Sequence, residues 1–435
     1  MNRTFRKALG SKQKALTSSV MTYKEKSTVE KTVLPNGLTV LSEFVPTVRS
    51  VSVGIWTNTG SRDEDKSNNG MAHFIEHLVF KGTKNRNFVE ISRSLEQVGG
   101  YLNAFTTKER TCFYARVLDE FLPTAVDVIS DLVFHPTFPK EEVEKEKDVI
   151  IEEIKSADDT PDDVIHDDFD KLLYGEHPLG FPIGGTEKSV RGITRKMALD
   201  FMQERYTTDQ MTLAAAGHVK HETLVKLAQS FIPDRRNPKR PNRTGFPMKA
   251  YQKKEREVKK PIQQAHLLLG FPFSRSDKDY YAMNLLNTIL GGGMSSRLNL
   301  ELRERHGLAY SVFSSFLTSD ETNLFNVYIG TDKNKLDKSE KLIYQELEKL
   351  ASKAPSQKEL ELSKAQLKGG LIMAQESMSS RAGHLSQDFY YFGRFREIAE
   401  VIDEVDSVSA SDIRTLASHL FDRSKFSVLK YLPKK

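Results

Sequence analysis

Cysteine and long hydrophobic runs are almost missing from this sequence. Cys112 is the single cysteine among 435 residues, which excludes an internal disulfide framework and a zinc site built from several thiolates. A reducing compartment fits this composition best. No stretch approaches the roughly 18 consecutive apolar residues of a membrane-spanning helix, so we predict a chain without a membrane span.

A strong excess of one charge is also missing. The 64 lysines and arginines are balanced by 59 aspartates and glutamates, which leaves a net charge of only +5. Such a small net charge does not indicate nucleic-acid binding, and we expect no nucleic-acid partner. The hydrophobic fraction of 38% and the length instead indicate a globular protein of two or three domains.

Acidic residues are absent from the start of the chain until Glu25, and residues 1–28 form a basic extension. The extension has no apolar segment of the length that a secretory signal peptide needs. Its basic, hydroxylated and acid-poor composition overlaps with that of an organellar transit peptide, and a solvated basic tail is the alternative. The residues alone leave both interpretations open.

The chain contains an internal repeat. Residues 233–261 concentrate proline and arginine without helical or strand periodicity, and they predict a linker between two halves, 29–232 and 262–435. Each half contains, in the same order, an apolar strand, a helix, a hairpin and amphipathic helices. Aligning the late helices matches three apolar pairs: Val143 with Leu360, Ile150 with Leu367, and Ile154 with Leu371. We therefore predict an α+β unit that is used twice.

Two histidines four residues apart lie in the segment GMAHFIEHLVFKGT. On a helix of about 3.6 residues per turn, His73, Glu76 and His77 share one face, away from the apolar residues. Two such imidazoles can bind one metal ion at about 2.0 to 2.1 Å, and the glutamate can act as general base on a metal-bound water. The alternative is a helix with two partly exposed histidines, but the motif arises by chance only roughly 0.04 times in such a chain.

A catalytic zinc needs a third protein ligand, and the acidic helix EEVEKEKDVIIEEIKSADD is the obvious source. Glu146 and Glu153 lie two turns apart on one face of this helix, whereas Glu152 points about 100° away. A glutamate-rich helix is usually a solvated face, so this helix alone does not choose among its acids. A looser alignment of the halves adds three pairs: His73 with Met283, Glu76 with Leu286, and His77 with Asn287. Since Ser363 and Gly370 match Glu146 and Glu153, the second half keeps the scaffold without the metal chemistry.

These motifs resemble those of the pitrilysin-type zinc peptidases, the inverzincins. The resemblance rests on HFIEH at 73–77, on Glu153 in EKDVIIEEI 76 residues later, and on the NGLTV and GSRDE segments. The resemblance covers the chain from about Val29 to the C-terminus. Within the family, the chain resembles most the short branch that contains the processing-peptidase beta subunit and its bacterial relatives. The resemblance implies two similar LuxS/processing-peptidase-like α+β domains, each a mixed sheet with helices on one face, that form a clamshell chamber.

The resemblance also implies roles for the residues of the metal motif. One Zn²⁺ per chain would be bound by His73, His77 and Glu153, with Glu76 as the general base. Glu146 matches an acidic position that supports catalysis two turns before the distal ligand.

Four further residues have roles only through the resemblance. Asn103 and Ala104, in the segment NAFT, match a strand edge that pairs with the substrate backbone. Arg303 and Tyr310 match a pair that is brought across from the second half, where a guanidinium and a phenol suit a substrate carbonyl and a developing oxyanion. Without the resemblance, all four would be ordinary strand or surface residues.

We therefore expect a zinc metallopeptidase that hydrolyses extended peptides or unfolded protein segments, as a homodimer or as a heterodimer with a similar non-catalytic subunit. The alternative is a non-catalytic presequence-binding or structural core-type subunit of the same fold. The long glycine-rich loop of the inert partner subunit is missing, since LGGGMSSRL is only a short cluster, and the metal set is complete. We expect the cytoplasm of a bacterium, or the mitochondrial matrix if the basic extension is a transit peptide.

Overall fold

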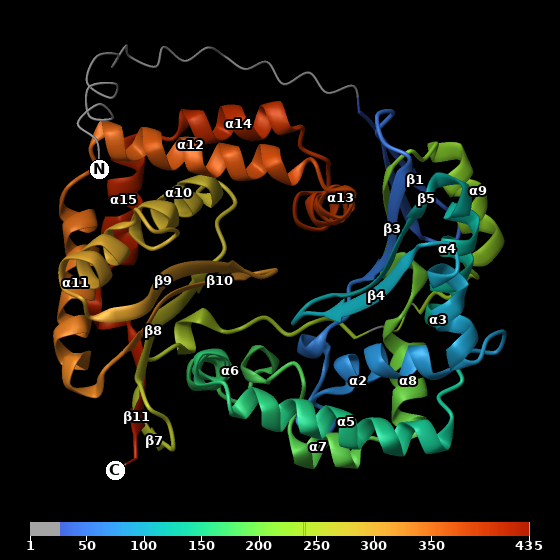
Figure 1. Cartoon of the computed structure of the whole chain (residues 1–435), viewed down its shortest axis with the longest axis horizontal. Helices are drawn as coiled ribbons and strands as arrows, with labels where there is room; N and C mark the ends of the chain where they lie inside the picture. The colour runs from blue at the N-terminus through green and yellow to red at the C-terminus, as the bar shows by residue number, and fades with distance from the viewer. Residues whose placement is uncertain (1–26, 238, 240, 435) are drawn as a thin grey trace, which may run out of the picture.

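Two mixed β-sheets form the scaffold of the molecule (Figure 1). This computed structural model describes residues 27–237, 239 and 241–434, so nearly all of the basic extension predicted at 1–28 lies outside the described residues. The first sheet has the strand order β1-β2-β6-β3-β5-β4. Its strands are β1 (Thr28–Val33), β2 (Thr39–Phe44), β3 (Ser50–Thr57), β4 (Tyr101–Thr106), β5 (Thr111–Leu118) and β6 (Met211–Gly217).

The second sheet repeats the topology of the first. Its order is β7-β11-β8-β10-β9, and its strands are β7 (Glu255–Lys260), β8 (Ala265–Ser274), β9 (Ala309–Thr318), β10 (Thr322–Thr331) and β11 (Ser427–Pro433). The pairs β2–β6 and β7–β11 are parallel, and the other pairs are antiparallel. The order β7-β11-β8-β10-β9 therefore superimposes on β2-β6-β3-β5-β4, which confirms the predicted α+β unit used twice.

The helices follow the same repeat. Those of the first half are α2 (Met71–Leu78), α3 (Phe88–Glu96), α4 (Leu122–Phe134), α5 (Lys140–Asp158), α6 (Pro161–Tyr174), α7 (Glu187–Gly192), α8 (Arg195–Arg205) and α9 (His221–Phe231). Those of the second half are α10 (Tyr280–Leu290), α11 (Leu336–Ser352), α12 (Gln357–Ala374), α13 (Met378–Phe392), α14 (Ile398–Ser407) and α15 (Ala410–Leu420). The first residues of α5 and α12 are separated by the same 217 positions as Val143 and Leu360, so the predicted helix alignment is in register.

Part of the predicted linker is regular structure. Strand β7 occupies 255–260, within the range 233–261 that was expected to have no strand. It pairs in parallel with β11 at the edge of the second sheet, and most of its side chains are exposed. Because an exposed edge strand needs no apolar face, its sequence EREVKK has no hydrophobic alternation to reveal it.

Each sheet is covered on one face by helices of its own half. The core of the first half lies between its sheet and α2, α4, α8 and α9, and includes Phe74, Phe113 and Phe201. The core of the second half lies between its sheet and α10, α11 and α15, and includes Phe325 and Leu347. This agrees with the predicted packing of helices on one face.

The opposite face of the second sheet is covered by a helix of the first half. Ile165, Phe169 and Leu173 of α6 are almost fully buried in a cluster of their own. Their partners there include Leu268 of β8 and Leu429 of β11. Burial of this apolar surface attaches the second half to α6.

The reciprocal contact is made by α13 of the second half. Its residues Ala382 and Leu385 are buried against Leu41 of β2 and Trp56 of β3. Figure 1 shows α13 between strand β3 and the ends of α12 and α14. The halves have therefore exchanged helices, so that neither sheet has a solvent-exposed apolar face.

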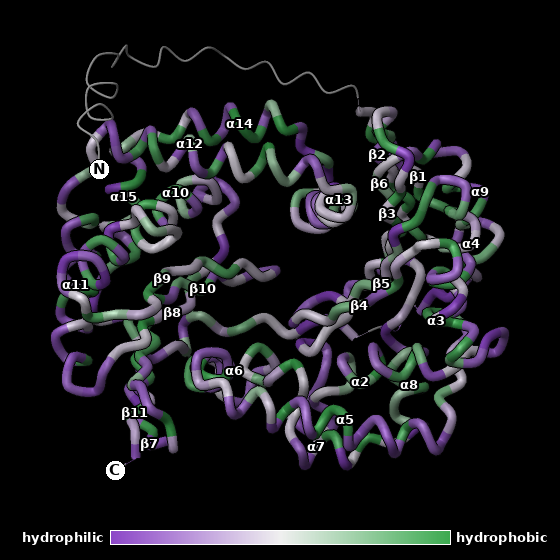
Figure 2. Tube along the Cα trace, viewed as in Figure 1, coloured by the Kyte–Doolittle hydropathy of each residue, from purple (hydrophilic) through white to green (hydrophobic). Residues whose placement is uncertain are grey.

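The long helices are amphipathic. In Figure 2, α5, α11 and α12 alternate between hydrophobic and hydrophilic segments, as helices do when they bury one face. Among residues 27–434, apart from the two omitted positions in the linker, no helix combines the length and the apolar character needed to cross a bilayer.

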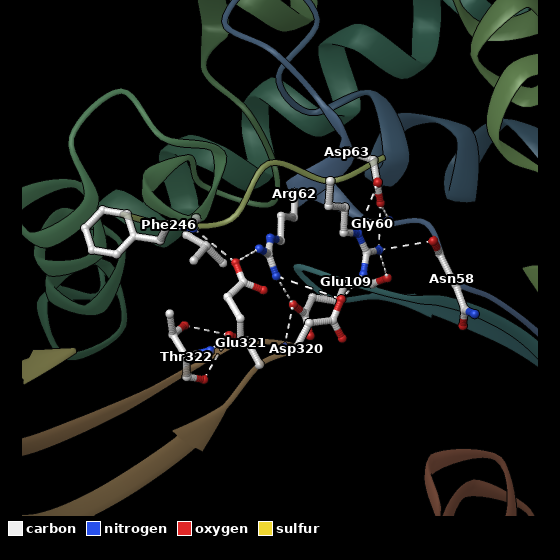
Figure 3. A network of polar contacts seen from close by, with 12 residues as sticks. Asn58, Gly60, Arg62, Asp63, Glu109, Phe246, Asp320, Glu321 and Thr322 are labelled. Atoms are coloured by element: carbon white, nitrogen blue, oxygen red, sulfur yellow. Dashed lines mark hydrogen bonds and ion pairs between the residues drawn. The ribbon is translucent and has the colours of Figure 1, made fainter. Parts of the chain in front are cut away.

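Buried charges join the two halves beside the hairpin turns (Figure 3). Arg62 lies in the short 3₁₀ helix η1 (Ser61–Asp63), and its side chain is only 1% exposed. It forms ion pairs with Glu109, in the β4–β5 turn, and with Glu321, in the β9–β10 turn of the other half. The guanidinium thus fixes the two turns to each other.

Arg243 of the linker makes a second connection. Its Nη2 lies 2.8 Å from Oδ2 of Asp63, whose side chain is fully buried, and its Nη1 lies 2.7 Å from Oδ2 of Asp320. Its Nη1 also donates to the hydroxyl of Tyr390 in α13 at 2.8 Å. One arginine therefore links both halves and the exchanged helix.

Replacing Arg243 with alanine should destabilise the protein strongly, because Asp63 would lose one of its ion-pair partners while staying buried. We expect a loss of about 3 to 5 kcal/mol in the free energy of unfolding, measured by chemical denaturation. The control is Arg236→Ala, in the same linker, where an exposed ion pair with Asp234 is removed and the loss should be much smaller. Equal effects of the two substitutions would contradict the role given to Arg243.

Candidate metal centre

The histidine motif lies on α2 with its two faces separated as predicted. Phe74, Ile75 and Leu78 are fully buried in the core of the first half. The side chains of His73 and His77 remain 22% and 18% exposed. The apolar residues of the motif therefore hold the helix in place, while its polar residues face the solvent-accessible side.

Glu153 of α5 completes a cluster with the two histidines. Its Oε2 lies 4.0 Å from Nε2 of His73 and 3.7 Å from Nε2 of His77. One potential ligand atom from each of the three residues lies within 4.8 Å of the others. These separations are close to the about 3.4 Å expected between tetrahedral ligands of a zinc ion. By contrast, Glu152 is 73% exposed and pairs with Lys155, so the structure selects Glu153 from the acidic helix.

Glu146 orients one of the histidines. Its Oε1 lies 2.9 Å from Nδ1 of His77, and its Oε2 lies 2.7 Å from Nζ of Lys81 in the 3₁₀ helix η2 (Val79–Lys81). Because a carboxylate can only accept, we assign the proton to Nδ1, which leaves Nε2 of His77 free to face Glu153. Glu146 therefore acts through His77.

The charges around His77 shift the pKa values of both partners. Burial alone would lower the pKa of His77, but the hydrogen bond to Glu146 and the charge of Glu153 raise it above its ordinary value. Burial likewise opposes ionisation of Glu146, yet its hydrogen bonds to His77 and Lys81 hold its pKa below the usual range. Each group stabilises the charged form of the other.

Desolvation dominates the electrostatics of His73, in contrast to His77. Burial, assisted by the nearby His77, lowers the pKa of His73 to about 4. Its Nδ1 is buried and has no hydrogen-bond partner among the described residues. A neutral imidazole is the form that binds metals. Two such nitrogens and a carboxylate match the ligand set of a catalytic zinc, so this donor set fits the predicted ion.

Glu76 lies next to the ligands and contacts the predicted substrate strand. Its Oε2 accepts a hydrogen bond of 2.6 Å from Oγ1 of Thr106 on β4. Burial raises the pKa of Glu76, although the hydrogen bond from Thr106 opposes this shift. A carboxylate with a raised pKa is a better proton acceptor than a solvated one.

Strand β4 also carries Asn103 and Ala104. It is the last strand of the first sheet, paired only with β5 among the described strands. Asn103 is exposed, and its Nδ2 donates to the hydroxyl of Tyr101 at 2.6 Å. Because β4 pairs with β5 on one side only, the other edge of β4 can accept an added strand.

Arg303 and Tyr310 lie in the other half of the molecule. Arg303 belongs to the π-helix η7 (Asn299–Arg305), and Tyr310 belongs to β9. Tyr310 is 71% exposed, and neither residue forms a hydrogen bond or ion pair with the histidine motif or Glu153 in the described part of the chain. Figure 1 shows β9 and α2 in different halves of the molecule, with α6 and the linker between them. The structure brings the metal residues together but leaves this pair apart from them.

Two supporting residues were missed from the sequence. Lys81 follows His77 by four positions, a spacing that places it near the same helical face and could have been noticed. Thr106 lies in the NAFT segment, but its bond to Glu76 depends on how β4 packs beside α2. That contact has no local signal in the sequence.

Comparison with known proteins is consistent with this geometry. Residues 39–187 match the family described as insulinase, peptidase family M16, and residues 192–367 match the peptidase M16 inactive domain. The uncharacterized zinc protease YmxG of Bacillus subtilis is 38% identical over 387 residues, covering 89% of this chain and 94% of that relative. An uncharacterized zinc protease of Mycobacterium tuberculosis is 38% identical over 403 residues, covering 90% of this chain and 91% of that relative.

Solved structures share the fold. A protease from Helicobacter pylori has a TM-score of 0.87 with 24% identity, covering 94% of this chain and 100% of that one. An M16 inactive-domain peptidase structure from Pseudomonas fluorescens has a TM-score of 0.85 with 21% identity, covering 94% of this chain and 98% of that one. At these identities the likeness concerns the architecture of the two halves.

The link between Glu146 and His77 can be tested by titration. In protein freed of metal by a chelator, Glu146→Gln should lower the pKa of His77, because the carboxylate charge that opposes the effect of burial is removed. Histidine NMR signals recorded against pH measure the shift, and His73, which has no contact with Glu146, should keep its low pKa. An unchanged pKa of His77 would show that Glu146 does not control it.

Proposed function

The chain belongs to peptidase family M16, and from this premise we propose that it is a zinc-dependent metallopeptidase acting on extended peptides or unfolded protein segments. The observation that carries the proposal is the cluster of His73, His77 and Glu153, with Glu76 beside it. These three residues would hold one zinc ion per chain. When bound, zinc would supply Lewis acidity, which polarises a peptide carbonyl and acidifies a water molecule.

The protein groups carry the proton transfers. Glu76 accepts a proton from the attacking water and passes it to the leaving amine, so that one water is consumed for each peptide bond broken. The hydrogen bond from Thr106 holds the carboxylate of Glu76 in position. Glu146, which is itself held by Lys81, keeps the ring of His77 in the orientation that ligation requires.

The outer edge of β4, which pairs with no further strand among the described residues, supports an extended substrate. A peptide that pairs with Asn103 and Ala104 would lie along the strand that also carries Thr106, and therefore next to Glu76. Such pairing needs unpaired backbone groups on the substrate, which folded segments do not offer. We therefore propose unfolded segments or peptides as the substrate class.

Arg303 and Tyr310 are proposed to assist after the halves approach each other. A guanidinium and a phenol can donate hydrogen bonds to the substrate carbonyl and to the charge that develops on its oxygen. Both side chains are exposed on the second half, which leaves them available to a bound peptide.

The rival function is that of a non-catalytic presequence-binding or structural subunit. The complete set of His73, Glu76, His77 and Glu153 argues against it, because a purely structural role would not need this arrangement. We propose a homodimer, or a heterodimer with a similar non-catalytic chain. The bacterial source of the relatives supports the cytoplasm of a bacterium over the mitochondrial matrix.

Metal analysis with two variants tests the proposed function. We expect about one zinc per chain in the wild type and none in His77→Ala, because a ligand is lost. Glu76→Gln should keep the zinc but lose activity on an unstructured peptide by about 10²- to 10⁴-fold, since only the general base is removed. A folded wild type that binds no zinc from zinc-containing buffer would refute the peptidase proposal.

The need for a partner can be tested on the chain expressed alone. Light scattering should show a dimer, and the zinc-loaded dimer should cleave an unstructured peptide, because every proposed catalytic residue belongs to this chain. A zinc-loaded chain without activity would instead indicate that a second, similar subunit is required for substrate binding.

A further inference from the structure

The metal-bearing helix α2 begins without a cap of the usual kind. Its N-cap is Gly70, in the left-handed region with a φ of 94°, and no side chain at this position can accept a hydrogen bond. A Cβ at position 70 would lie 2.8 Å from the carbonyl oxygen of Gly184, which excludes the serine, threonine, aspartate or asparagine that normally caps a helix. The first backbone N–H groups of α2 therefore need acceptors from elsewhere.

Glu64 supplies these acceptors from six residues upstream. Its Oε2 accepts from the backbone N–H of Gly70 at 2.7 Å and from Nδ2 of Asn69 at 3.0 Å. Its Oε1 accepts from the backbone N–H of Ala72 at 2.7 Å. All three donors are N–H groups, and a negative charge here is favoured by the helix dipole. Since Ala72 directly precedes His73, Glu64 fixes the turn from which the first histidine projects.

The carboxylate of Glu64 is held in a site that is costly for a charge. The residue is only 4% exposed, and burial raises its pKa, whereas its three hydrogen bonds, all from N–H donors that suit the ionised carboxylate, act in the opposite direction. If one oxygen were removed, a buried N–H of the helix would lose its acceptor. Glu64 is therefore a specific acceptor for the start of α2 and cannot be exchanged freely for another polar side chain.

The segment that carries Glu64 is itself anchored. The two preceding residues, Arg62 and Asp63, are tied to Glu321 and Arg243 in the network between the halves (Figure 3). On the other side, Nδ2 of Asn69 also donates to the carbonyl oxygen of Pro182 at 2.9 Å, which places the 182–185 loop beside the start of α2. The position of Glu64 is thus set by contacts outside α2.

We propose that Glu64 is a positioning residue of the metal centre, which holds the first turn of α2 so that His73 faces His77 and Glu153. The inference rests on the proposed zinc site. It gives the two histidines separate supports: Glu146 and Lys81 for His77, and Glu64 for His73. Glu64 does not touch the metal or the substrate and acts only through the helix.

The test measures zinc affinity and not only activity. Glu64→Gln keeps the size of the side chain but replaces one acceptor oxygen with a donor, so the contacts with Gly70 and Ala72 cannot both persist. We expect the dissociation constant for zinc, measured by competition with a chelator, to rise about 10- to 100-fold. The matched control is Glu43→Gln, a buried glutamate of the same half that pairs with Arg381 of α13. It should lower the melting temperature of the metal-free protein without changing zinc affinity.

A second variant covers the case in which Glu64→Gln does not fold. Asn69→Ala removes one of the three donors to Glu64 but leaves the carboxylate and the backbone bonds, and it should raise the zinc dissociation constant by a smaller factor. Unchanged zinc affinity in the folded variants, or an equal rise in Glu43→Gln, would overturn the role of Glu64. A wild type that binds no zinc would overturn the proposed function itself, so the two failures are distinguishable.

Discussion

The structure depends on how each sheet covers its second apolar face. The helices of one half pack on only one face of their own sheet, and the other face is covered by a helix from the opposite half, α6 or α13. Separating the halves would expose both apolar clusters to water, a cost that grows with the area uncovered. The ion pairs of Arg62 and Arg243 lie between these two contacts and fix the hairpin turns to each other. The metal cluster and the facing strand β9 are consequently parts of one assembly.

The repeat explains why the residues of the candidate metal centre occur in one half only among the aligned positions. At the positions that match the motif, Met283 and Leu286 are buried in or beside the second core, and Asn287 accepts a hydrogen bond of 2.7 Å from Ser314. On α12, Ser363 donates to the backbone of its own helix at 2.9 Å. The second half has thus used these positions for packing and local hydrogen bonds. In the first half, the same positions carry polar side chains that are partly buried, and such groups must be paired or bind a metal.

Local patterns in the sequence were sufficient for the hairpins, for the two faces of α2 and for the repeated helix register. The structure places Glu153 beside His73 and His77, while its role as a metal ligand stays a prediction. The exchange of α6 and α13 could not be predicted. An amphipathic sequence indicates that one face of a helix is buried, but it does not indicate which sheet covers that face. Strand β7 was missed because its exposed side chains carry no alternation. The hydrogen bonds from the start of α2 to Glu64 were not predicted, because Glu64 lies six residues before the N-cap position and not at it.

The same anchoring accounts for the separation of Arg303 and Tyr310 from the metal cluster. The ion pairs fix Asp320 and Glu321 in the turn at one end of β9, whereas Tyr310 lies near the other end of that strand. At about 3.3 Å per residue, the ten residues from Asp320 back to Tyr310 correspond to a distance of about 30 Å along the strand. Both side chains are exposed, and among the residues that the structure describes neither forms a hydrogen bond or ion pair with the first half. The hairpin is therefore held to the first half at its turn and also along β9, where the ring of Phe313 stacks on His166 of α6, while the side chains of Arg303 and Tyr310 stay exposed.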